Sequence, residues 1–360
     1  MWAIAVKEFR QLRRDRRTVG LMVMAPLTLL VVFGFAARFD VEEVPTVLVG
    51  DGVSRLERSL PDLFHVVGSR SGGEEEAVDA LRRGEAAVAV VGGSSLRILV
   101  DGAELFSAQA ALRSLSAQRA EGLRAGGAPA VPPTVRVLFN PDLETSAVMV
   151  PAIAGMILVF IGTLITSLGV VRERQGGTLE QLAVMPFRPW DVFIGKVAPY
   201  FMVASIDLAL VVGVGVWLFD VPFRGSIGTF VVGALLFLFV TLGMGVLVSS
   251  VSQNQGQAIQ LAMMLLLPQV LLSGMIFPVE SMAEGVRWIA YLLPLTYFIE
   301  LARGVMLRAA PLDALWLPLG MLAALGVVVF GLAVLRFRRD LAPARTRRRH
   351  RPRPEIEEAA

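Results

Sequence analysis

Residues 171–200 read V-R-E-R-Q-G-G-T-L-E-Q-L-A-V-M-P-F-R-P-W-D-V-F-I-G-K-V-A-P-Y. The stretch is polar, charged and rich in turn-forming residues, yet one apolar run ends at Val171 and another starts near Val192. A simple connector between two membrane spans has no need of so many polar side chains. The stretch therefore predicts two spans joined by a short surface segment that contacts another protein.

The composition indicates an integral membrane protein. Of the 360 residues, 55% are hydrophobic and 18% are charged, and the mean hydropathy of +0.64 is high for a soluble domain. Apolar runs of about 20 residues are long enough to cross a bilayer core of roughly 30 Å as helices. Such runs occur at 19–37, 148–171, 193–218, 226–251, 257–277 and 313–335. The sequence thus predicts an α-helical membrane protein with six transmembrane helices.

Residues 38–146 interrupt this pattern, because charges are frequent there and long apolar runs are missing. Strand patterns occur at 44–52, 96–102 and 134–141, a helix, a glycine stop and a strand at 74–91, and a further helix at 104–124. We therefore expect a small α/β domain inserted between the first two spans.

A less apolar stretch, 278–308, lies before the last predicted span and is interrupted at Pro294. It is too polar for a clean span and too apolar for a free loop. A re-entrant pair of outer half-helices fits, because irregular backbone is tolerated at membrane depth where it packs on protein.

The predicted organisation has five parts. They are a basic interfacial helix at 1–18, the first span at 19–37, the α/β domain at 38–146, the remaining five spans at 147–336, and a basic tail at 337–360. Arginines crowd both ends of the chain and the connector at 172–191, so both termini and this connector are expected in the cytoplasm. The α/β domain is then extracytoplasmic. The arginine tail is expected to contact anionic lipid rather than nucleic acid.

The residue inventory excludes several kinds of chemistry. The chain has no cysteine, so disulfides and thiolate catalysis are excluded. His65 and His350 are far apart in sequence, and no H-E-x-x-H zinc motif exists. Gly195-Lys196 is not preceded by the first glycine of a phosphate-binding loop, because Trp190 stands there. We expect neither an enzyme nor a bound cofactor, and energy for transport must come from a partner or an ion gradient.

The ion-gradient alternative needs an ionisable group within a span. Asp207 is the clear candidate, since an acidic residue inside a membrane is a functional hypothesis by default. The simpler interpretation is that Asp207 faces the bundle or a neighbouring subunit and is hydrogen-bonded there.

The polar stretch at 172–191 offers a short amphipathic helix. Gly176-Gly177 lets the chain turn, Thr178 followed by Gln181 forms a capping-box pattern, and Pro186 ends the segment. A capped helix that projects from two spans can enter a cleft in a partner and transmit its motion. By spacing alone, a solvated connector is an equal alternative. The candidate contact residues are Glu173, Arg174, Gly177, Thr178, Glu180, Gln181, Leu182 and Pro186.

Four segments resemble type-2 ABC exporter permeases of the drug-exporter branch, which carry a large insert after the first span. They are F-N-P (139–141) with S-A-V-M-V-P-A (146–152); R-E-R-Q-G-G-T-L-E-Q-L (172–182) with M-P-F-R-P (185–189) and G-K-V-A-P-Y (195–200); Q-N-Q-G-Q-A (253–258) with L-L-S-G-M-I-F-P-V-E (271–280); and L-P-L-T-Y-F-I-E-L-A-R-G-V-M-L-R (293–308). One departure is Gln175, where the family loop usually has an acidic residue.

The resemblance implies a permease that forms a homodimer or heterodimer and binds two ABC ATPase subunits, which hold ATP and Mg. Residues 173–182 would form the coupling helix that meets the ATPase. The outer helices would close the exit of the path, with an outer gate region at Ser273, Gly274, Phe277, Pro278, Glu280, Pro294, Glu300 and Arg303. We expect such a protein in a bacterial or archaeal cell membrane, exporting drugs or other lipophilic compounds.

Two other functions remain open at this point. One is a membrane-anchored sensor or binding protein whose working part is the domain at 38–146. The other is a proton-coupled transporter that uses Asp207.

Overall fold

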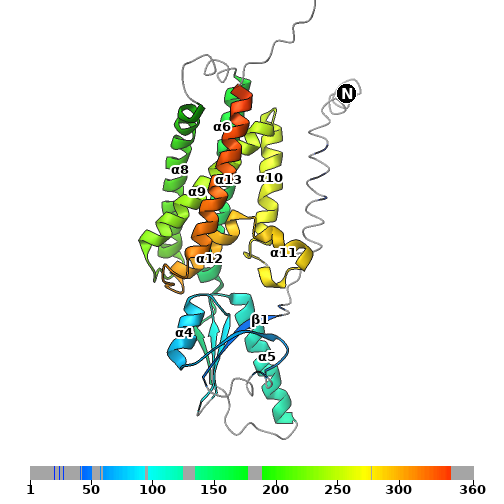
Figure 1. Ribbon diagram of the computed structural model, residues 1–360, viewed down its shortest axis with the longest axis vertical. Helices are drawn as coiled ribbons and strands as arrows, with labels where there is room; N and C mark the ends of the chain where they lie inside the picture. The colour runs from blue at the N-terminus through cyan, green and yellow to red at the C-terminus, as the bar shows by residue number, and fades with distance from the viewer. Residues whose placement is uncertain are drawn as a thin grey trace, which may run out of the picture.

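A helical bundle carries a mixed α/β domain at one end (Figure 1). The computed structural model describes residues 41, 43–50, 57, 60–93, 96–124, 134–176, 189–276 and 278–341, together with Gly20, Met24 and Leu27. The predicted interfacial helix at 1–18, almost all of the predicted first span at 19–37 and the tail from residue 342 lie outside the described residues.

Five long helices build the described part of the bundle, and each is long and apolar enough to cross a membrane. They are α6 (Thr145–Gln175), α8 (Pro189–Leu218), α9 (Ile227–Val251), α10 (Gln255–Leu272) and α13 (Trp316–Leu341). Each coincides with one of the apolar runs found in the sequence. The chain is therefore a multi-pass membrane protein.

Two short helices and a 3-10 turn follow α10, where the sequence predicts half-helices. They are η1 (Val279–Ser281), α11 (Glu284–Ala290) and α12 (Pro294–Met306). Helix α10 ends at Leu272, earlier than the predicted run, because Gly274 adopts a left-handed φ of +83°. Pro294 occupies the first turn of α12, where a missing N–H costs nothing.

The bundle packs around the buried α12. The rings of Phe237 on α9 and Phe298 on α12 stack with centroids 4.3 Å apart. Gly155 lets α6 approach the same ring, because a Cβ at this position would lie 2.5 Å from a ring carbon of Phe298. Small residues at such crossings allow close helix contact in membranes.

The described residues of the α/β domain form one five-stranded sheet with the strand order β2-β1-β3-β4-β5. Among these described strands, only β3 and β4 pair in antiparallel fashion. Its elements are β1 (Val44–Val49), β2 (Phe64–Arg70), α4 (Glu74–Arg82), β3 (Val88–Val91), β4 (Arg97–Asp101), α5 (Leu105–Arg124) and β5 (Thr134–Leu138). Successive strand residues point to opposite faces, so α4 packs on one apolar face and α5 on the other.

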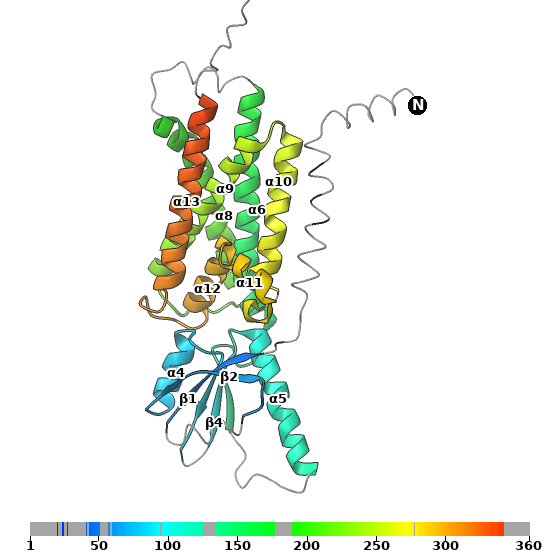
Figure 2. The ribbon, with the colours of Figure 1, turned by 45° about the vertical axis from the view of Figure 1, so that its right-hand side comes forward.

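Helix α6 runs the length of the bundle. It starts a few residues after β5 beside the α/β domain and ends at the opposite end of the bundle (Figures 1 and 2). Its 31 residues correspond to a length of about 46 Å. The polar stretch after Gln175 therefore starts far from the α/β domain.

Candidate functional site

At the end of the bundle far from the sheet, Arg174 connects α6 to the turn between α9 and α10 by hydrogen bonds. Its Nη1 donates hydrogen bonds to the carbonyl oxygens of Ser249 and Ser252, at 2.9 and 3.0 Å. These carbonyls belong to the C-terminal end of α9, which lacks helical partners there. The side chain of Gln255 also donates to that of Gln175, at 3.2 Å. The end of α6 is therefore hydrogen-bonded to the adjoining ends of α9 and α10.

Most of the predicted coupling residues are not placed by the structure. Glu173 and Arg174 are partly buried in the last turn of α6. The others lie outside the described residues: Gly177, Thr178, Glu180, Gln181, Leu182 and Pro186.

Asp207 lies at a partly buried position in the middle of α8. It makes no hydrogen bond or ion pair with another residue in the part of the chain that the structure describes. The predicted interior hydrogen bond is thus not formed within the described residues of one chain.

The predicted outer gate residues gather beside the α/β domain, around a cavity of about 440 Å³. One wall comes from the sheet domain and the other from α12 and the turn after α10. Six of the predicted residues line it: Ser273, Gly274, Pro278, Glu280, Glu300 and Arg303. Pro294 is buried at the start of α12, and Phe277 lies outside the described residues.

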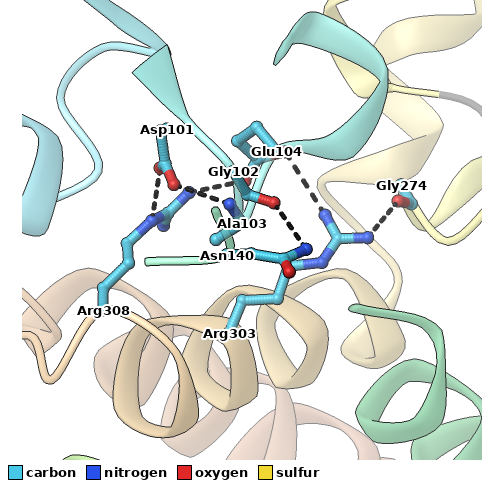
Figure 3. Close-up of polar contacts among 8 residues, drawn as sticks. All are labelled: Asp101, Gly102, Ala103, Glu104, Asn140, Gly274, Arg303 and Arg308. Atoms are coloured by element: carbon cyan, nitrogen blue, oxygen red, sulfur yellow. Dashed lines mark hydrogen bonds and ion pairs between the residues drawn. The ribbon is translucent and has the colours of Figure 1, made fainter. Parts of the chain in front are cut away.

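A group of four charged side chains, of which three are buried and Glu104 is partly exposed, joins the α/β domain to α12 (Figure 3). Arg308 is 6% exposed, and its Nε and Nη2 donate to Asp101 and Glu104, each at 2.7 Å. Arg303 donates to the other oxygen of Glu104 at 3.4 Å and to the carbonyl of Gly274 at 3.3 Å. The carboxylates lie at the end of β4 and in the turn before α5. We call these four residues, Asp101, Glu104, Arg303 and Arg308, the ionic joint.

The turn that carries the two carboxylates is itself held in place by hydrogen bonds. Asp101 accepts a hydrogen bond from the backbone N–H of Ala103 at 2.8 Å. Asn140 donates to the carbonyl oxygens of Gly102 and Glu144. Residue 102 must be glycine, because a Cβ there would lie 2.5 Å from the carbonyl oxygen of Asn140.

Burial and the neighbouring charges act in opposite directions on the pKa values of the residues in the ionic joint. Burial raises the pKa of Asp101 to about 6, although the charge of Arg308 opposes this. Burial also acts to raise the pKa of Glu104, but the charges of Arg303 and Arg308 outweigh it and hold this pKa below its usual value. Burial alone would lower the pKa of Arg308, and the two carboxylates raise it instead. Removing one partner of the buried pair of Asp101 and Arg308 leaves an uncompensated charge, which costs roughly 3–5 kcal/mol.

Two further contacts hold the domain on the bundle. Arg83, just after α4, reaches Asp313 before α13, with 2.6 Å between Nη1 and Oδ2. Arg224, between α8 and α9, donates to the carbonyl of Phe139 at 3.0 Å. An apolar cluster that includes Leu307 fills the space beside the joint. The α/β domain is thus fixed to the bundle at several separate points.

From the sequence, Arg303 was predicted as a functional residue of the outer gate, but Asp101, Glu104 and Arg308 were not predicted. A signal existed: Arg303 and Arg308 are cations in a mostly apolar stretch, and a buried cation requires an anionic partner.

Comparison with known proteins identifies the same family that the sequence motifs resemble. The profile of the ABC-2 family transporter protein matches residues 16–335. A probable multidrug ABC transporter permease of Escherichia coli (strain K12), YbhR, is 28% identical over 365 residues, covering 95% of this chain and 99% of the relative. Another, YbhS from the same strain, is 28% identical, covering 94% of this chain and 97% of the relative.

A third relative matches a shorter part of the chain. The inner membrane transport permease YhhJ of Escherichia coli (strain K12) is 33% identical over 223 residues, or 59% of this chain and 57% of the relative. Because the family profile spans most of the sequence, and the described residues form five helices long and apolar enough to cross a membrane, the chain belongs to the ABC-2 family of transporter proteins, as a membrane permease.

Proposed function

We propose that this permease is the membrane subunit of an ATP-driven exporter whose energy comes from a separate ABC ATPase. The observation that carries the proposal is the course of α6. This helix begins beside the α/β domain, ends in the polar stretch at the far end of the bundle, and is bound there to α9 and α10 through Arg174. A push on residues 173–182 would therefore reach the cavity at the other end through continuous helix.

The proposed topology has six spans, with residues 19–37 as the first. Both termini and the polar stretch at 172–191 lie in the cytoplasm, and the α/β domain lies outside. The C-terminal end of α6 and the α/β domain lie at opposite ends of the bundle, which supports this orientation (Figure 1), as does the arginine bias of the sequence. The helices α11 and α12 then form the outer re-entrant pair that closes the exit.

The proposed assembly is a permease homodimer or heterodimer with two ATPase copies, in a bacterial or archaeal inner membrane. ATP and Mg bind to the ATPase and not to this chain. Relatives named as multidrug transporter permeases support an export substrate among drugs or other lipophilic compounds.

The test is purification of the tagged permease with its ATPase, followed by native mass spectrometry. We expect an ATPase to co-purify, and Glu180→Ala combined with Leu182→Ala to release it. Glu75→Ala, on the exposed side of α4, is the control and should leave the complex intact. A permease that transports without any ATPase would contradict the proposal.

Asp207 supports a second candidate, transport driven by protons, because it is a partly buried carboxylate without a partner among the described residues. Under this alternative, Asp207→Asn abolishes transport without loss of the folded protein. Under the ATP-driven mechanism, Asp207→Asn leaves ATP-dependent transport in place.

A further inference from the structure

The cavity between the α/β domain and the outer helices is lined partly by apolar side chains and partly by charged ones. Its volume is about 440 Å³. Its apolar lining comes from both sides, with Val67 from the domain and Val279, Tyr291, Ile299 and Leu317 from the bundle. Its polar lining consists mainly of charged side chains. A lining of these two kinds suits a ligand with an apolar body and a charged group, as in many small-molecule sites.

The charges on this lining do not balance. In the ionic joint, Arg303 and Arg308 are matched by Asp101 and Glu104. Glu85 is paired with Arg70. Glu280 and Glu300 remain, and neither forms an ion pair with any residue that the structure describes. Arg287 is nearby and its charge acts to lower the pKa of Glu280, but its guanidinium donates to the backbone carbonyls of Glu280 and Met282 and forms no ion pair with a described carboxylate. The cavity thus carries an excess of negative charge.

The two unpaired carboxylates lie in a setting that favours a cationic partner. Both glutamates are exposed residues on the cavity lining. Desolvation raises the pKa of both Glu280 and Glu300, and the charge of Glu104 adds to this effect, whereas nearby arginines act to lower both pKa values. A cation between the two glutamates would oppose the effect of desolvation, because an opposite charge stabilises the ionised form of a carboxyl group.

An independent observation at the same wall also indicates a missing partner. Ser273 lines the cavity and is 2% exposed. Its buried hydroxyl makes no hydrogen bond within the described part of the chain. Buried polar groups are nearly always hydrogen-bonded, so this hydroxyl lacks the partner that most buried hydroxyls have. Tyr291, half exposed, adds an aromatic face that attracts cations.

We propose that this cavity is a binding site for organic cations with an apolar body, held by Glu280 and Glu300. The inference rests on the proposed export function, since a site beside the outer helices would receive the substrate just before its release. It extends that function by naming the class of substrate, lipophilic monovalent cations.

The test measures binding to the purified full-length permease in nanodiscs of uncharged lipid. The probe is radiolabelled tetraphenylphosphonium, and binding to empty nanodiscs is subtracted. Tetraphenylborate has the same shape with the opposite charge and serves as the matched ligand. We expect saturable binding of the cation only. The combined Glu280→Gln and Glu300→Gln variant should bind it about tenfold more weakly or worse, because two attractive charges are removed.

Two controls separate loss of charge from loss of fold. Asp142→Asn removes an exposed carboxylate that does not line the cavity, and it should bind the cation normally. Glu280→Asp with Glu300→Asp keeps both charges and should retain most of the affinity. Equal binding of the cation and the anion, or unchanged binding in the glutamine variant, would overturn the inference. The assay needs no ATPase, so this result is independent of whether an ATPase co-purifies.

Discussion

At the scale of single residues, Asp101 and Glu104 meet the same arginine but should respond to pH in opposite ways. The folded protein holds the Asp101 proton up to about pH 6, whereas the reference pKa is 3.8. Between these values the folded state binds the extra proton, so the contribution of Asp101 to stability decreases as the pH rises and is constant above about 6. For Glu104 the folded pKa is lowered from 4.5. Its contribution is present above that pH and is lost as the pH falls.

The prediction is measured as the melting temperature of the wild type minus that of each variant. For Asp101→Asn this difference should fall between about pH 4 and 6, by the equivalent of roughly 3 kcal/mol for two pKa units. For Glu104→Gln it should rise as the pH is increased toward 4.5 and stay constant above that pH. Two curves parallel to that of the wild type would show that neither carboxyl group is coupled to folding as described.

The same residues show why only Arg303 of the ionic joint was predicted from the sequence. Arg303 stands out because a cation in an apolar stretch needs a partner. The partners of Arg308 are 207 and 204 positions earlier in the chain. No local pattern encodes such a pairing, because it is formed by the packing of the α/β domain on the end of the bundle. An aspartate and a glutamate after a strand otherwise look like any polar turn.

At the scale of elements, the crossing of α6 and α12 depends on Gly155. An added Cβ would lie 2.5 Å from a carbon of Phe298 and 2.7 Å from one of Leu295. Both of these side chains are fully buried and have no space into which to move. We therefore predict that Gly155→Ala destabilises the protein by about 1–3 kcal/mol, the usual cost of overpacking.

The matched control is Gly213→Ala on α8, where no heavy atom lies within 4 Å of the added Cβ. Its melting temperature in detergent should equal that of the wild type, and that of Gly155→Ala should be several degrees lower. Equal melting temperatures for the two variants would mean that α6 and α12 do not pack as described.

The helices of the bundle were predictable and one strand was not, for physical reasons. A membrane span is a long run of apolar residues, so its presence is evident from composition alone. Strand β2 is an edge strand whose residues are alternately covered and exposed, and its F-H-V-V-G-S-R sequence contains no apolar run. The end of α10 was missed by a few residues because Gly274 stops the helix within apolar sequence.

At the scale of the whole molecule, the orientation in the membrane can be measured with single cysteines, since the chain has none of its own. Glu75 on α4 and Gln175 at the end of α6 are both exposed. In spheroplasts, a membrane-impermeant maleimide should label Glu75→Cys. It should label Gln175→Cys only after the membrane is permeabilised. Labelling of both variants, or the reverse pattern, would contradict the proposed six-span topology.

At this scale, the α/β domain is fixed to the bundle by several contacts. The ionic joint, the Arg83–Asp313 pair and the contact of Arg224 with Phe139 fix it to α12 and to neighbouring turns. A movement of α12 should therefore carry the domain with it and change the cavity between them. This arrangement fits a part of a transport path better than a sensor on a tether.

The central claim is that the polar segment at 173–182 docks on an ATPase. The most direct measurement is a cross-link from Leu182→Cys to amines of the co-expressed ATPase, with Glu75→Cys as the control. The account predicts a joined product of permease and ATPase from position 182 and none from position 75. A cross-link from position 75, or none from position 182 in a complex that contains the ATPase, would contradict it.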